Sequence, residues 1–129
     1  MSASHCGQLT LATAGRGALA CDMEEVIARP ISAWLDLLGA KAFKLAEIVM
    51  RETGDNLDGP ATRVWTVIEC LRKVGAAIDA PLVLDGVTED GWVMLSSGSL
   101  VAATHIAPIR DAEQPLAMAV LTGRKNASL

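Results

Sequence analysis

The apolar residues of this chain change their spacing at Pro81, and this change constrains the fold more than any other feature. Before Pro81 they recur every three or four residues, as along the buried face of an α-helix. After Pro81 they form short runs separated by glycine-containing turns, as in antiparallel strands. The sequence therefore predicts an α+β fold in which N-terminal helices pack on a C-terminal antiparallel β-meander.

The length and composition fit one folded domain. The 129 residues form a single unit, 1–129, whose ends at 1–8 and 123–129 we expect to be flexible. Apolar residues make up 51% of the chain and the net charge is only −4, a balance that excludes intrinsic disorder. The isoelectric point near 5.0 argues against a general nucleic-acid binder, which needs basic residues to neutralise phosphates.

Three helical segments are predicted before Pro81, at 22–28, 31–53 and 60–79. In the first, Asp22 and Glu25 have the spacing of a capping box, and Pro30 ends the helix. Gly39 lies where the second helix could bend or split. Ahead of these helices, the alternation over 9–14 predicts a short strand.

Beyond Pro81 the sequence predicts three strands and one ambiguous apolar run. The strands are 82–84, 92–95 and 100–104, and the run at 116–121 fits either an edge strand or a short helix. The last two of these segments are apolar on both faces, whereas a two-layer domain leaves one face of its antiparallel sheet in water. We therefore expect a second copy of the chain to cover that face in a homodimer.

No complete catalytic or metal-binding motif is present in the sequence. The two histidines, His5 and His105, lack the short-spaced partners of a zinc site, so we expect no metal and no cofactor. Ser99 and His105 could share a sheet, but no nucleophile elbow surrounds them. The glycine pattern at 15–20 has the form of a dinucleotide fingerprint, yet repeated βαβ units are missing. Whether the protein is an enzyme stays open, and the sequence favours a non-enzymatic role.

The cysteines and the lack of a long apolar stretch bear on location. Cys6, Cys21 and Cys70 are odd in number and irregularly spaced, which indicates reduced thiols in a cytoplasmic protein. No window reaches the roughly 18 uninterrupted apolar residues of a membrane span, so we expect no membrane partner.

The leading hypothesis is a small regulatory, adaptor or inhibitor module that self-associates and binds a protein partner. The first candidate contact is Trp92, because tryptophan is enriched at binding hot spots. Acidic residues at the predicted hairpin could meet a basic partner: Asp85, Glu89 and Asp90.

Two alternatives stay open. Three helices followed by a hairpin are the element order of a winged-helix DNA-binding regulator. Its third helix would carry the DNA contacts: Arg63, Thr66, Arg72 and Lys73. The acidic hairpin would face phosphates with the wrong sign, which disfavours nucleic acid. The other alternative is a small enzyme whose site forms at a dimer interface.

Overall fold

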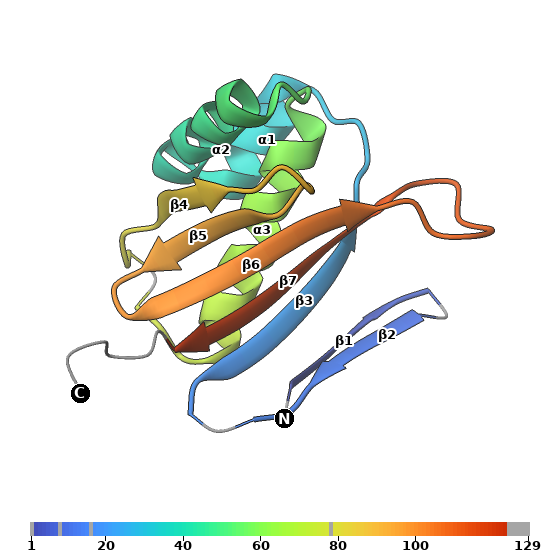
Figure 1. Ribbon diagram of the computed structural model, residues 1–129. Coiled ribbons are helices and arrows are strands. Elements are labelled where there is room, and N and C mark those ends of the chain that lie inside the picture. Colours follow the sequence, from blue (N-terminus) through green and yellow to red (C-terminus); the bar gives the residue numbers. More distant parts are fainter. Residues whose placement is uncertain (1, 8, 16, 78, 124–129) are drawn as a thin grey trace.

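The computed structural model describes residues 2–7, 9–15, 17–77 and 79–123 (Figure 1). Along this part of the chain the elements are β1 (Ser2–Cys6), β2 (Leu9–Thr13), β3 (Leu19–Glu25), α1 (Ile31–Leu38), α2 (Ala40–Thr53), α3 (Asp58–Lys73), β4 (Val83–Val87), β5 (Val93–Ser97), β6 (Leu100–Ala107) and β7 (Leu116–Gly123). They form a two-stranded hairpin, a five-stranded sheet and a helical layer on one face of that sheet.

The five-stranded sheet has the order β3-β7-β6-β5-β4, and each neighbouring pair is antiparallel. The predicted meander is present as β4 to β7, and the ambiguous run at 116–121 is a strand. β3 pairs with β7 along its whole length, from Leu19 opposite Thr122 to Glu25 opposite Leu116. The chain between β3 and β4 therefore has to carry all three helices across one face of the sheet (Figure 1).

The predicted layer order, with N-terminal helices packed on a C-terminal meander, is wrong. Three strands precede the first helix, and the helix predicted at 22–28 is mostly strand β3. A helix of seven residues gains little from its own hydrogen bonds, since nucleating the first turn is unfavourable. Pairing with β7 instead supplies hydrogen bonds along the segment and buries Ala20, Cys21 and Met23.

Two glycines set the boundaries of α1 and α2 as the sequence predicted, whereas the predicted end of α3 was wrong. Gly39, at φ 81°, separates α1 from α2, and Gly54, at φ 76°, ends α2 in the left-handed conformation that glycine favours. α3 ends at Lys73, before the predicted residue 79. The amide of Gly75 donates to Arg72 O and that of Ala76 to Leu71 O, which together close the helix in a Schellman motif.

The core lies between the helices and the inner face of the sheet. Its buried side chains include Trp34 of α1, Val49 of α2, Val64 of α3, Leu95 of β5 and Leu121 of β7. Each of the three helices contributes to it, so the helices and the sheet share one core.

The hairpin of β1 and β2 packs beside the free edge of β3. The amide of Cys21 donates to Ser2 Oγ at 3.1 Å, and Lys73 Nζ donates to Cys21 O at 2.7 Å and to Ala3 O at 3.3 Å. Covering an edge strand in this way blocks unwanted strand pairing. Of the ends predicted to be flexible, residues 2–6 form β1 and Gly123 ends β7, while residues 1, 8 and 124–129 lie outside the described residues.

Asp22 is the buried charge at this contact. Its side chain accepts a hydrogen bond from Ser4 Oγ at 3.2 Å and lies 3.5 Å from Lys73 Nζ. The other carboxylate oxygen has no partner among the described residues. Burial raises the pKa of Asp22, and the attraction of Lys73, which lowers the pKa, only partly offsets it.

The wild type should lose part of its free energy of unfolding as the pH rises, and we expect Asp22→Asn to abolish this loss. Because the pKa is raised on folding, the carboxyl favours the folded state at low pH, and this contribution is lost as the pH rises through the folded pKa. The free energy of unfolding of the wild type, relative to that of the variant, should therefore fall between acidic and neutral pH. Urea denaturation at both pH values measures this. The exposed Asp36→Asn is the matched control, and a difference independent of pH would contradict the expectation.

Candidate functional site

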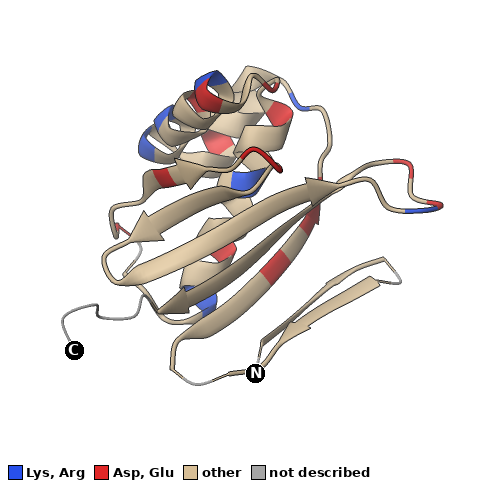
Figure 2. Cartoon of the chain, in the orientation of Figure 1, with Lys and Arg blue, Asp and Glu red and all other residues tan. Residues whose placement is uncertain are grey.

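The face of the sheet away from the helices is apolar and carries no formal charge over three strands. β5, β6 and β7 contain no Lys, Arg, Asp or Glu (Figure 2). Leu95, Ala102 and Leu121 point into the core, so the alternate residues point outward. These outward residues include a cross-strand row of Met94, Ala103 and Val120, all partly exposed.

Such a face is unusual because an antiparallel sheet with one solvated face normally alternates apolar and polar residues. We call it the open face and define it by the outward residues Met94, Val101, Ala103, His105, Met118 and Val120. Two uncharged polar residues, Ser96 and Thr122, lie opposite Val101 at the other end of this face. The hairpin packs on β3 and leaves β5 to β7 without a covering layer among the described residues. An uncharged, largely apolar face of this kind is a candidate interaction surface.

Trp92 and His105 form one end of the open face. Their ring centroids lie 4.7 Å apart with an interplanar angle of 56°. His105 Nε2 is 3.1 Å from Asp90 O, so this side chain connects β6 to the turn between β4 and β5. The sequence offered only Ser99 as a neighbour of His105 on the sheet and did not predict its contact with Trp92.

The turn at residues 88–92 is held by its own hydrogen bonds. The Thr88 amide donates to Trp92 O at 2.8 Å, and the Trp92 amide donates to Thr88 Oγ1 at 3.0 Å. The Thr88 hydroxyl also donates to the Asp90 carboxylate. The turn therefore presents Glu89 and Asp90 to solvent from a fixed backbone.

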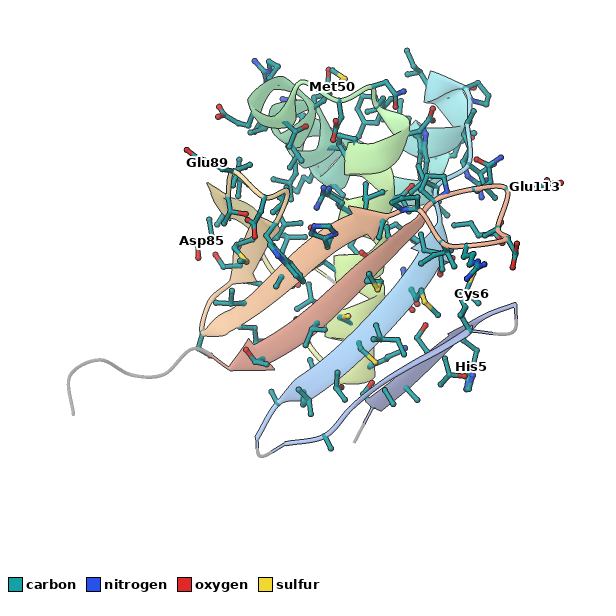
Figure 3. All side chains as sticks on the ribbon, turned by 45° about the vertical axis from the view of Figure 1, so that its right-hand side comes forward. His5, Cys6, Met50, Asp85, Glu89 and Glu113 are labelled. Atoms are coloured by element: carbon teal, nitrogen blue, oxygen red, sulfur yellow. The ribbon has the colours of Figure 1, made fainter. Side chains whose placement is uncertain are left out.

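The predicted partner-binding residues lie together at this edge of the sheet. Asp85, Glu89 and Asp90 are exposed, and Trp92 is partly exposed beside them. Figure 3 shows Asp85 and Glu89 projecting from the β4 side of the molecule, far from His5 and Cys6 of the hairpin. Whether this group binds a protein stays a prediction.

The predicted DNA-binding residues do not form one surface. Arg63 is only 4% exposed and Thr66 is fully buried, with its hydroxyl donating to Arg63 O at 2.6 Å. Arg72 is exposed and pairs with Glu69 at 2.6 Å, whereas Lys73 is used at the hairpin contact. α3 packs against the sheet, so it does not project from the domain as the recognition helix of a winged-helix protein does.

Arg63 is instead a buried cation that connects α3 to the sheet. Its Nη1 donates to Thr104 O at 2.9 Å and to Thr104 Oγ1 at 3.1 Å, and its Nη2 donates to Gly91 O at 3.1 Å. In the described part of the chain Nε has no partner, and neither of the two ion pairs involves this guanidinium. Burial lowers the pKa of Arg63, because desolvation disfavours its charged form. The hydrogen-bond partners of the guanidinium are all neutral, and the attraction of Asp55, which raises the pKa, only partly offsets the effect of burial.

A pocket of about 430 Å³ lies beside this guanidinium, and we call it the Arg63 pocket. It lies where the first turn of α3, the turn at 88–92 and β6 meet. Its lining combines Arg63 with two carboxylates, Asp55 and Asp90, and two aliphatic side chains, Val26 and Ile106. Cations, anions and apolar groups therefore surround one small volume.

The structure gives less support to a metal site, a membrane span or a reactive thiol. Over residues 2–7, 9–15, 17–77 and 79–123, no group of three His, Cys, Asp or Glu side chains could hold a metal ion. No helix in these ranges has the length and hydrophobicity needed to cross a membrane. The three cysteines are free, and burial raises the pKa of Cys70 to about 12, which leaves it an unreactive thiol at neutral pH.

Comparison with protein families, characterised proteins and solved structures finds no match to this chain. The function therefore has to be inferred from the chemistry of the site.

We expect Thr104→Val to destabilise the fold by about 1–3 kcal/mol, because it leaves Arg63 without one acceptor and Val93 O without its hydroxyl donor. Urea denaturation followed by circular dichroism measures this loss. Thr122→Val on the exposed end of β7 is the matched control and should change stability little. Equal effects of the two substitutions would show that the Arg63 contacts contribute nothing.

Proposed function

We propose that the protein is a non-enzymatic interaction module, which self-associates through the open face and binds a protein partner through the turn at 88–92. The observation that carries the proposal is the open face itself: apolar outward residues on three neighbouring strands without a formal charge. Burying such a surface gains roughly 25 cal/mol for each Å² of apolar area removed from water.

A second copy is the occupant that best matches the open face. Charged partners select one another through complementary ion pairs, and β5 to β7 offer no charged group for that purpose. An isologous dimer places the same patch against itself, so two apolar faces meet.

The size of the face sets the strength expected of this dimer. β5, β6 and β7 have 5, 8 and 8 residues. With a rise of about 3.3 Å per residue and about 4.8 Å between strands, they cover a footprint of about 330 Å². Stable complexes bury about 800 Å² on each partner. We therefore expect a reversible dimer in the micromolar range or weaker.

The partner would contact the turn at 88–92. Glu89 and Asp90 offer negative charge next to the partly exposed ring of Trp92, which suits a basic segment with an apolar or cationic side chain that packs on the indole. Because hydrogen bonds already fix the turn, its binding requires little further ordering.

We expect Val120→Lys to weaken self-association by about tenfold or more, since it places a like charge on the β7 side of the open face in both copies. Sedimentation equilibrium over a series of concentrations measures the dissociation constant. Ile48→Lys on the exposed side of α2 is the matched control and should leave the constant unchanged. A wild type that stays monomeric at the highest attainable concentration would refute the proposal.

We expect Glu89→Lys to abolish capture of a basic partner, because it reverses the charge at the tip of the turn. Affinity capture by the wild type and the variant, at low and high salt, compares the bound proteins by mass spectrometry. Glu113→Lys, on the loop between β6 and β7 (Figure 3), is the matched control for a change in net charge. Equal losses in both variants would show that overall charge, and not the turn, is responsible.

A further inference from the structure

We propose that the Arg63 pocket binds a free α-amino acid with a small apolar side chain. This inference goes beyond the proposed interaction function and does not depend on it. It rests on the residues that line the pocket: a buried arginine that forms no ion pair, two aspartates and two aliphatic residues. Asn56 and His105 complete the polar part of the lining.

The carboxylate of the ligand would bind Arg63. The guanidinium is 4% exposed and its hydrogen bonds go to neutral acceptors. Asp55 is the opposing charge that acts on it, but the two form no ion pair, so the burial of the guanidinium is only partly compensated. The pocket also reaches the first turn of α3 at Gly59, where the helix dipole adds positive potential. A carboxylate bound here would give Arg63 a direct ion pair.

The ammonium group of the ligand would bind Asp55 and Asp90. These two carboxylates come from different elements, the loop between α2 and α3 and the turn at 88–92, and both line the pocket. They would repel a simple anion such as phosphate, so a ligand drawn to Arg63 must also carry positive charge. A metal cation is disfavoured in turn by the guanidinium. A zwitterion satisfies both kinds of group.

The side chain of the ligand would pack against Val26 and Ile106, which form the aliphatic part of the lining. The volume of about 430 Å³ lies at the small end of the range for ligand pockets. A Cβ at Gly59 would lie 3.2 Å from Ile106 Cδ1, so no spare room remains at that end. Both observations favour a small apolar side chain such as that of valine.

Titration of the full chain with L-valine, followed by calorimetry and amide chemical shifts, tests the proposal. Two analogues separate the contributions of its charged groups: 3-methylbutanoate lacks the ammonium and isobutylamine lacks the carboxylate. We expect each analogue to bind about tenfold more weakly than valine or worse, with the shifts from valine confined to residues around Arg63, Gly91 and Ile106. Equal affinity for 3-methylbutanoate would reveal a plain anion site and overturn the proposal. An absence of binding by all three probes would overturn it as well.

Variants that keep Arg63 test the contribution of the other lining residues to binding. Asp55→Asn should weaken valine binding about tenfold and strengthen binding of 3-methylbutanoate, because it removes a partner of the ammonium and a repeller of the anion. Gly59→Ala should weaken binding, because the added methyl group would press on Ile106, part of the aliphatic lining. Glu89→Gln, exposed on the same turn but outside the lining, is the matched control. If Asp55→Asn weakened both ligands alike, the two-charge arrangement would be refuted. Sedimentation of the same samples reports self-association separately, so the two proposals can fail independently.

Discussion

The pairing of β3 with β7 determines the architecture of this domain. It joins a strand that precedes all three helices to the last strand of the chain, over seven residue pairs. The helices are then confined to the connection between β3 and β4 and cover one face of the sheet. Only the hairpin is left for the opposite side, and it packs on β3. The open face is thus a consequence of the topology as well as of composition.

The same pairing explains what the sequence could and could not predict about the fold. The meander, the break at Gly39 and the end of α2 at Gly54 depend on residues within a few positions of one another, and they were predictable. β3 was not, because its partner lies at the other end of the chain. The local spacing of Asp22 and Glu25 favoured a helix, and tertiary pairing overrode that preference.

The candidate site divides in the same way. Trp92, Glu89 and Asp90 belong to one turn, so sequence alone could group them. The winged-helix alternative placed Arg63 on the exposed, DNA-contacting face of its third helix. Its spacing of four residues from Val67 and seven from Cys70, both fully buried, placed it on the inner face of α3. That signal was available, whereas the approach of Asp55 and Val26 to Arg63 required the folded structure.

His105 connects the two surfaces of the candidate site. Its ring packs against Trp92 at one end of the open face, and the same side chain lines the Arg63 pocket and contacts the backbone of Asp90. Arg63 contacts the neighbouring Gly91. A ligand in the pocket and a second copy on the open face would therefore meet the same short turn from opposite sides. Linkage then requires reciprocity: if a ligand shifts the turn toward the conformation favoured in the dimer, dimer formation must raise the affinity for that ligand by the same factor.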